Sequence, residues 1–330
     1  MDLTTTYCGL TIKSPLIAGA SPLSRRVEEA CRLEEAGAGA VVMYSLFEEQ
    51  IAYEQVLLHQ VAARACESQP EAMSYLPDAE GFDQGPQGYL DQIRQLKQNL
   101  SIPVIASLNG VSDSGWADYA RLIENAGADA LELNVYEMTF GEHATSRCIE
   151  DRIVHLVKHV RRATGLPLAI KLLPYFAGLP SLCDRLLEAG ANAAVLFNRT
   201  YQPYIDLAEL EMSGAYPLSQ PNELAPRLRW LGLVSSASPI ELACSGGVHH
   251  SEDAIRAIMC GASVVQLVSV LLERGVEMLT QMHDDIAFWL EAHGYTGLDE
   301  LRGSMDHRHC PDPWAYTRSS YIRTLHNYVL

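Results

Sequence analysis

The residues best suited to chemistry in this chain of 330 residues are two short groups of small residues, each of which follows an apolar run. Ser245, Gly246 and Gly247 follow the run at 240–244, and Val268 and Ser269 end the run at 261–269. A buried strand that ends in Ser-Gly-Gly exposes consecutive backbone N–H groups with no Cβ in the way, as a phosphate oxygen requires. An ordinary strand-to-helix turn is the commoner meaning of a lone Gly-Gly. The place of the two groups in the fold therefore decides their meaning.

A repeated phrase predicts the elements that position them. E-A-G-A-G-A-V-V-M-Y at 35–44 returns as N-A-G-A-D-A-L-E-L-N at 125–134, as E-A-G-A-N-A-A-V-L-F-N at 188–198 and as M-C-G-A-S-V-V-Q-L-V at 259–268. In each copy an amphipathic helix ends at Gly, the usual left-handed C-cap, and small and β-branched residues follow. This pattern predicts a helix that leads into a buried parallel strand.

Four more apolar runs, three of which start at a proline, complete a set of eight strands; they lie at 15–19, 103–107, 167–171 and 240–244. Proline is acceptable at the first residue of a strand. Helical patterns alternate with the strands, at 24–35, 116–125, 150–164, 179–188 and 251–260.

Eight β/α units in this length predict a TIM (β/α)8 barrel that forms one domain over residues 1–330. We expect insertions after strand two (47–88) and after strand six (198–226), and a C-terminal tail over 303–330. A doubly wound open sheet is the alternative, but its G-x-G-x-x-G after the first strand is replaced here by A-G-A-S-P at 18–22.

In such a barrel the two groups of small residues end strands seven and eight. The loops after these strands most often hold a ligand phosphate, so phosphate binding becomes the favoured interpretation. Ser251 is predicted to cap the next helix, whose dipole would add to the site.

The other strand ends predict the rest of the barrel mouth, which presents Ala20-Ser21, Tyr44-Ser45, Asn109, Asn134, Lys171 and Asn198. A buried cation such as Lys171 needs an anion or an electron-rich ring, although a lysine that simply reaches solvent is the alternative. Asn134 and Asn198 each offer a donor and an acceptor to a planar heterocycle. Glu132 and Gln266 are interpreted as interior polar residues without direct chemistry.

Composition excludes several classes of partner. The formal net charge of −17 disfavours nucleic acid and anionic membranes, which require a basic face. The eight cysteines are scattered without a C-x-x-C pair, so we expect reduced core thiols. No metal site is expected either, although the tail contains His307 and His309. Without a long apolar run or a basic leader pattern at its start, the chain is expected to be cytoplasmic.

Several of these motifs make the chain resemble the dihydroorotate dehydrogenase family of FMN-dependent barrels. The most specific are A-G-A-D-A-L-E-L-N, L-A-I-K-L-L-P-Y-F, S-G-G-V followed by E-D-A, and the closing G-Y-T-G-L-D-E-L-R-G. The resemblance implies FMN across the barrel mouth and a homodimer that acts on a small-molecule substrate of pyrimidine biosynthesis.

The resemblance also implies roles for the residues of the mouth. The FMN phosphate would lie on Ser245, Gly246, Gly247, Val268 and Ser269, and Lys171 would stand beside the N1/O2 side of the ring. Three asparagines would contact the ring or the substrate: Asn109, Asn134 and Asn198. Ala20 and Ser21 would line the edge of the flavin.

Other positions depart from the family pattern. Tyr44 stands where the family has a lysine in a T-K-S context, and residues 72–78, which end at Asp78, replace an asparagine-containing substrate loop. Glu137 falls at the position of the family's Cys or Ser base. A carboxylate whose pKa is raised by burial could take a carbon-bound proton, although an exposed loop glutamate is an equal alternative. Tyr136 is a second acid/base candidate, and Arg199 could replace the missing cation.

Three functions remain open from the sequence. The leading one is hydride transfer between flavin N5 and a CH–CH bond next to a carbonyl, in dihydroorotate or a related dihydropyrimidine. The second keeps the cofactor and changes the substrate, and the third is a flavin-binding barrel without catalysis. A phosphosugar isomerase-type barrel would explain the phosphate site but leaves Lys171, Asn134 and Asn198 without a role.

Overall fold

The computed structural model describes residues 1–49, 85–110, 112–136, 145–199, 202–215 and 217–317, together with 322, 325 and 326. The strands are β1 (Thr5–Tyr7), β2 (Leu10–Ile12), β3 (Leu16–Ala18), β4 (Val41–Phe47), β5 (Val104–Asn109), β6 (Ala130–Asn134), β7 (Leu168–Leu172), β8 (Ala193–Leu196), β9 (Gln202–Asp206), β10 (Glu211–Ala215), β11 (Glu241–Ser245) and β12 (Val264–Leu267). The α-helices are α1 (Val27–Glu35), α3 (Gly85–Asn99), α4 (Asp113–Ala126), α5 (Ser146–Ala163), α6 (Leu179–Glu188), α7 (Leu224–Ala237), α8 (Ser251–Met259), α9 (Ser269–Arg274), α10 (Met278–Ala292) and α11 (Leu298–Leu301). Short 3₁₀ helices are η1 (Pro22–Arg25), η3 (Pro221–Glu223) and η4 (Pro313–Tyr316).

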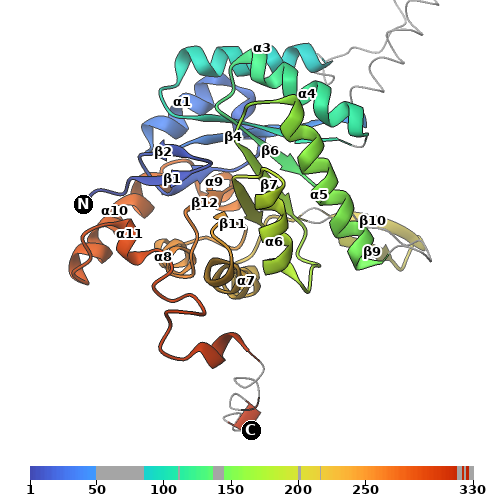
Figure 1. Cartoon of the computed structure of the whole chain (residues 1–330). Helices are drawn as coiled ribbons and strands as arrows, with labels where there is room; N and C mark the ends of the chain where they lie inside the picture. The colour runs from blue at the N-terminus through green and yellow to red at the C-terminus, as the bar shows by residue number, and fades with distance from the viewer. Residues whose placement is uncertain are drawn as a thin grey trace, which may run out of the picture.

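Eight parallel strands close into a barrel in the order β3-β4-β5-β6-β7-β8-β11-β12, and β12 pairs back with β3. Helices surround the strands (Figure 1). The closed ring confirms the predicted TIM barrel and excludes the open doubly wound sheet. It also brings the carboxyl ends of all eight strands to one face, where the predicted site residues were expected.

Two apolar clusters form the core. The larger one lies between the strands and the surrounding helices, with Met43, Leu133 and Ile170 among its members. The smaller one fills the barrel interior and includes Val42 and Ile105.

The hairpin of β1 and β2 closes the amino-terminal end of the barrel. Its residues Tyr7, Cys8 and Ile12 pack into the interior cluster. The Thr5 hydroxyl donates to the carbonyl oxygen of Ser263 just before β12. No repeat in the sequence predicts this hairpin. Because it closes one end of the barrel, the carboxyl ends of the strands are left as the place for a site.

The insertion after β8 contains a second antiparallel hairpin that was not predicted. Strands β9 and β10 pair along their whole length and project from the barrel (Figure 1). Exposed apolar side chains of this hairpin include Tyr204 on β9 and Leu207 and Leu210 in the turn. Residues 217–223, here called the strap, then return to the barrel and lead into α7. Most of the predicted insertion after strand two, residues 50–84, lies outside the described residues.

Two local predictions were wrong. The helix expected at 24–35 is divided, because Arg26 has an extended backbone between η1 and α1. The N-cap of α8 is His250 rather than Ser251: the Asp253 carboxylate accepts the backbone N–H groups of His249 and His250. Ser251 is instead the first helical residue, and its hydroxyl donates to Asp285.

The tail runs away from the barrel after α11 (Figure 1). Its backbone is tied to the preceding helices through Met305, whose N–H donates to Met259, and through His307, whose N–H donates to Gly232. Among the described residues, no helix combines the length and the apolar character that crossing a membrane would require.

Candidate functional site

A belt of polar side chains lies at the carboxyl ends of β4, β5 and β6. The hydroxyl oxygens of Ser45 and Ser107 are 2.8 Å apart, and the Asn134 amide donates to Ser45 at 2.9 Å. The register between β4 and β5 shifts between Val42 and Ser45, and beyond the shift Ser45 pairs directly with Ser107. The other amide atom, Asn134 Oδ1, is buried and has no hydrogen-bond partner among the described residues. Because an unpaired buried acceptor is costly, it indicates a place for a ligand donor.

Lys171 on β7 is buried and held by two neighbours. Its Nζ lies 3.0 Å from Glu132 Oε1 and donates to Gln266 Oε1 at 2.9 Å. The Gln266 amide in turn donates to the second oxygen of Glu132 at 2.5 Å. Glu132 is fully buried and Lys171 is 6% exposed. This triad confirms that the lysine has an anion and does not simply reach solvent.

Glu132 and Gln266 are interior polar residues, as predicted, and the triad shows what they contact. Both hold the Lys171 ammonium, which lies in register with Asn134 on the neighbouring strand. Because Glu132 and Gln266 hold the ammonium from inside the barrel, its position does not depend on a ligand at the barrel mouth.

The two groups of small residues meet beneath the strap. Gly246 and Gly247 have φ values of +89° and +80°, so both occupy the left-handed region that favours glycine. A Cβ on Gly247 would lie 2.5 Å from the backbone nitrogen of Leu224, at the start of α7. Glycine is therefore required at this turn both for its φ and for the close approach of α7.

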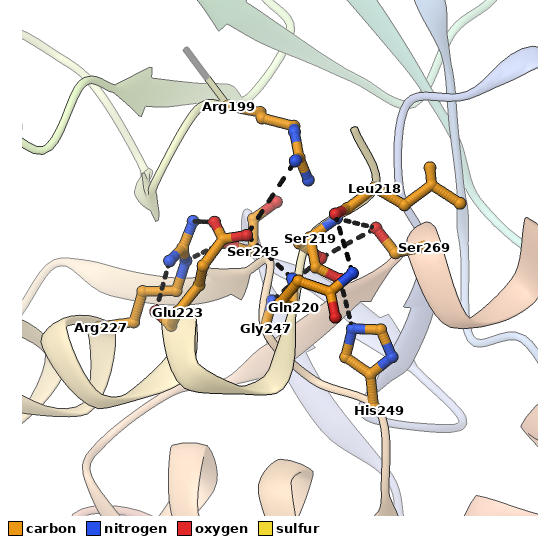
Figure 2. A network of polar contacts seen from close by, with 10 residues as sticks. All are labelled: Arg199, Leu218, Ser219, Gln220, Glu223, Arg227, Ser245, Gly247, His249 and Ser269. Carbon is orange, nitrogen blue, oxygen red and sulfur yellow. Dashed lines mark hydrogen bonds and ion pairs between the residues drawn. The ribbon is translucent and has the colours of Figure 1, made fainter. Parts of the chain in front are cut away.

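Ser219 of the strap joins the two strand ends, as Figure 2 shows. The Gly247 N–H donates to the Ser219 hydroxyl at 3.2 Å, and this hydroxyl donates to Ser269 Oγ at 2.8 Å. The Ser219 N–H also donates to Ser269 Oγ. His249 Nε2 lies 2.7 Å from the carbonyl oxygen of Ser219, so this ring nitrogen is the donor. The two predicted groups of phosphate residues thus lie together. Ser219, which the sequence pattern did not indicate, connects them.

Arg227 lies behind the same turn. Its Nε donates to the Ser245 carbonyl oxygen at 2.5 Å, and one terminal nitrogen donates to the Glu223 carbonyl oxygen at 2.5 Å (Figure 2). Burial lowers the pKa of the Arg227 guanidinium, and the nearby Cys244 and Glu223 oppose that shift. Burial raises the pKa of the Cys244 thiol to about 12, which agrees with a reduced core cysteine.

The remaining predicted residues lie in several environments. Asn109 ends β5 and Ala20 and Ser21 follow β3, with Ser21 buried. Asn198 follows β8, where its backbone N–H donates to Leu172. Tyr136 follows β6 and is 40% exposed.

The predicted substrate residues are only partly described. Tyr44 packs edge-on against Tyr89, with ring centres 5.1 Å apart, and the Arg25 guanidinium carbon lies 5.0 Å from the centre of its ring. Arg199 lies 4.0 Å from Glu223 (Figure 2). Glu137 and Asp78 lie outside the described residues.

These features fit a phosphorylated flavin. The glycine turn and Ser269 suit a phosphate, while Lys171 and the unpaired Asn134 Oδ1 offer a cation and an acceptor to a heteroaromatic ring. Among the described residues, no group of three His, Cys, Asp or Glu side chains could hold a metal ion.

Comparisons with known proteins give a consistent assignment. A sequence model of the family described as dihydroorotate dehydrogenase matches residues 78–290. The catalytic subunit of dihydroorotate dehydrogenase B (NAD(+)) from Methanosarcina acetivorans is 28% identical over 312 residues, which cover 89% of this chain and 93% of that protein. The corresponding subunit from Pyrococcus abyssi is 26% identical, with 89% and 96% covered. The NAD-dependent dihydropyrimidine dehydrogenase subunit PreA of Escherichia coli K12 is 22% identical, with 92% and 76% covered.

Proposed function

Since this chain belongs to the dihydroorotate dehydrogenase family and is an oxidoreductase of that family, we propose that it uses FMN to oxidise or reduce a CH–CH bond next to a carbonyl. The substrate class is dihydroorotate or a related dihydropyrimidine, in pyrimidine biosynthesis. The observation that carries the proposal is the buried cation Lys171 at the carboxyl end of β7. It lies on the same face of the barrel as the glycine turn after β11. We further propose a cytoplasmic homodimer.

Each part of the mouth has a role in this proposal. FMN, when bound, supplies the ring atom N5 that exchanges a hydride with the substrate carbon. Lys171, oriented by Glu132 and Gln266, favours negative charge on the N1/O2 side of the ring. Asn134 accepts a hydrogen bond through its unpaired Oδ1, and Asn109 and Asn198 bind the ring or the substrate.

The proton on the second substrate carbon requires a base. We assign this role to Glu137, with Tyr136 as the second candidate, because both follow β6 directly after Asn134. Arg199 supplies the cation for an anionic substrate, and Tyr44 and Asp78 line the substrate side.

The purified protein tests the proposal. We expect it to carry FMN or to take it up on reconstitution, and to show flavin bleaching in anaerobic stopped-flow mixing with a reducing dihydropyrimidine. Replacing Glu137→Gln and Tyr136→Phe, separately and together, should slow the bleaching at unchanged FMN content, because a base acts on the proton and not on cofactor binding. A protein that binds no FMN after reconstitution would end the proposal.

A second candidate is a family member with a different substrate. It is favoured by Tyr44, whose ring packs on Tyr89 and beneath Arg25 at the position of the family's lysine. Dihydroorotate, dihydrouracil and dihydrothymine compared in the same stopped-flow experiment separate the two candidates. Rapid reduction by dihydroorotate alone excludes the second, and bound flavin that no dihydropyrimidine reduces favours a barrel without catalysis.

A further inference from the structure

A buried guanidinium stands directly behind the glycine turn of the phosphate site. Arg227 lies in the first turn of α7 and is 8% exposed (Figure 2). Its three nitrogens contact two residues: Nε donates to the Ser245 carbonyl oxygen, one terminal nitrogen donates to the Glu223 carbonyl oxygen, and the other lies 3.7 Å from the Glu223 carboxylate. The side chain therefore ties the end of β11 to the end of the strap.

The bond to Ser245 sets the direction of the next peptide. In a trans peptide the C=O and N–H groups point in opposite directions. With the Ser245 carbonyl turned toward Arg227, and also accepting the Phe197 N–H at 3.3 Å, the Gly246 N–H is turned away from α7. A charged donor on the carbonyl also polarises the peptide and makes its N–H a stronger donor.

Gly246 accommodates the guanidinium as well as the φ of the turn. A Cβ at this position would lie 2.8 Å from a terminal nitrogen of Arg227. The absence of a side chain thus lets a full positive charge approach the backbone within one residue of the predicted phosphate donors.

The charge balance favours an anionic ligand here. The Glu223 carboxylate lies 3.7 Å from Arg227, whose other two guanidinium nitrogens donate to neutral carbonyl oxygens. In a chain of net charge −17, a phosphate dianion needs a local positive charge of this kind. The N-terminal end of α7, which abuts Gly247, has the same sign.

We propose that Arg227 is a positioning residue for the cofactor phosphate: it fixes the Ser245–Gly246 peptide with its N–H toward the phosphate and supplies a buried charge behind it. This inference rests on the proposed function, because it takes FMN as the ligand. It predicts that Arg227 discriminates between flavins with and without a phosphate.

The test compares FMN with riboflavin, which has the same ring system and no phosphate. Dissociation constants for both are measured by flavin fluorescence on flavin-free full-length protein carrying Arg227→Gln or Arg227→Lys. Arg229→Gln is the matched control, because it removes the same charge from an exposed position on the same helix.

We expect Arg227→Gln to weaken FMN binding by about tenfold or more and riboflavin binding by less than about twofold. Arg227→Lys should give an intermediate loss, since it keeps the charge and loses the planar fork. Equal losses for both flavins would show a structural role and overturn the inference, as would unchanged FMN affinity.

Thermal unfolding followed by circular dichroism checks that each variant folds. If Arg227→Gln does not fold, the ratio of FMN to riboflavin affinity in Arg227→Lys decides in the same way. A wild-type protein that binds neither flavin would overturn the proposed function itself, and a wild-type protein that binds FMN no better than riboflavin would overturn the phosphate site and this inference alone.

Discussion

Lys171 and Glu132 form a buried ion pair, and such pairs are sensitive to the loss of one partner. Replacing Lys171→Met leaves the fully buried Glu132 carboxylate without its cation. We expect the free energy of unfolding to fall by about 3–5 kcal/mol, measured by urea titration.

The control for this prediction is Lys97→Met, which breaks the ion pair with Asp129. The Lys97 side chain is 32% exposed and the Asp129 side chain is 28% exposed. Partial exposure should hold its cost to about 1 kcal/mol or less. Equal losses in the two variants would mean that Glu132 is not desolvated as the structure indicates.

Asn134 should separate stability from ligand binding. Its Oδ1 is buried without a partner, so Asn134→Ala removes an unsatisfied group along with one hydrogen bond to Ser45. We expect a stability change below about 1 kcal/mol and a loss of FMN affinity of about tenfold.

Asn192→Ala is the matched change at the other end of the barrel, where Asn192 Oδ1 accepts the Leu168 N–H at 3.0 Å. It should lower stability and leave FMN affinity unchanged. If Asn134→Ala lowers stability more than it lowers FMN affinity, Asn134 has a structural role only.

At the residue scale, sequence reasoning identified which side chains stand at the strand ends but not their partners. Lys171 was expected to need an anion or an electron-rich ring, but no pattern in the sequence paired it with Glu132, which lies on a different strand. Ser219 and Arg227 were missed for a similar reason: Ser219 belongs to the strap and Arg227 to the first turn of α7, and no period in the sequence relates these segments to β11 and β12.

At the element scale, the turn after β11 depends on the approach of α7. Gly247→Ala combines an unfavourable φ of +80° with a clash against the Leu224 backbone. Gly294→Ala, after α10, has a similar φ of +76° and nothing within 4 Å of its Cβ, so it isolates the cost of the φ alone.

We expect Gly294→Ala to cost about 1–2 kcal/mol and Gly247→Ala about 1–3 kcal/mol more, by chemical denaturation. Only Gly247→Ala should also impair FMN binding. Similar costs for the two variants would contradict the close contact between α7 and the turn.

Elements that follow the repeated β/α phrase were predictable, whereas those outside it were not. All eight barrel strands follow from the four repeated Gly-Ala phrases and the four further apolar runs. The hairpins β1–β2 and β9–β10 have strands of only three and five residues and stand outside the repeat, so no periodic signal marked them. The cap of α8 was misplaced by one residue because His250 and Asp253 form a reciprocal capping box: the His250 side chain accepts the Asp253 N–H, and the Asp253 carboxylate accepts the His250 N–H.

At the scale of the whole molecule, the net charge of −17 opposes the approach of a phosphate-bearing cofactor. Salt screens this repulsion, because the Debye length falls from about 30 Å at 0.01 M to about 8 Å at 0.15 M. We expect the association rate of FMN with the flavin-free protein to rise severalfold over this range, in stopped-flow fluorescence.

Riboflavin, which lacks the phosphate charge, should associate at a rate that hardly changes with salt. An FMN association rate that falls as salt rises would show instead that local cations such as Arg227 and Arg199 already dominate the field at the mouth.

The ring of strands closes where the first and last barrel strands meet, since β12 near residue 265 pairs with β3 near residue 16. The proposed phosphate-binding residues lie at this seam, at the end of β11 and directly after β12. A nascent chain therefore has no complete phosphate site until its last barrel strand is in place. Binding of the cofactor would then stabilise the closed barrel. The flavin content of a preparation would report the fraction of molecules in which the barrel has closed.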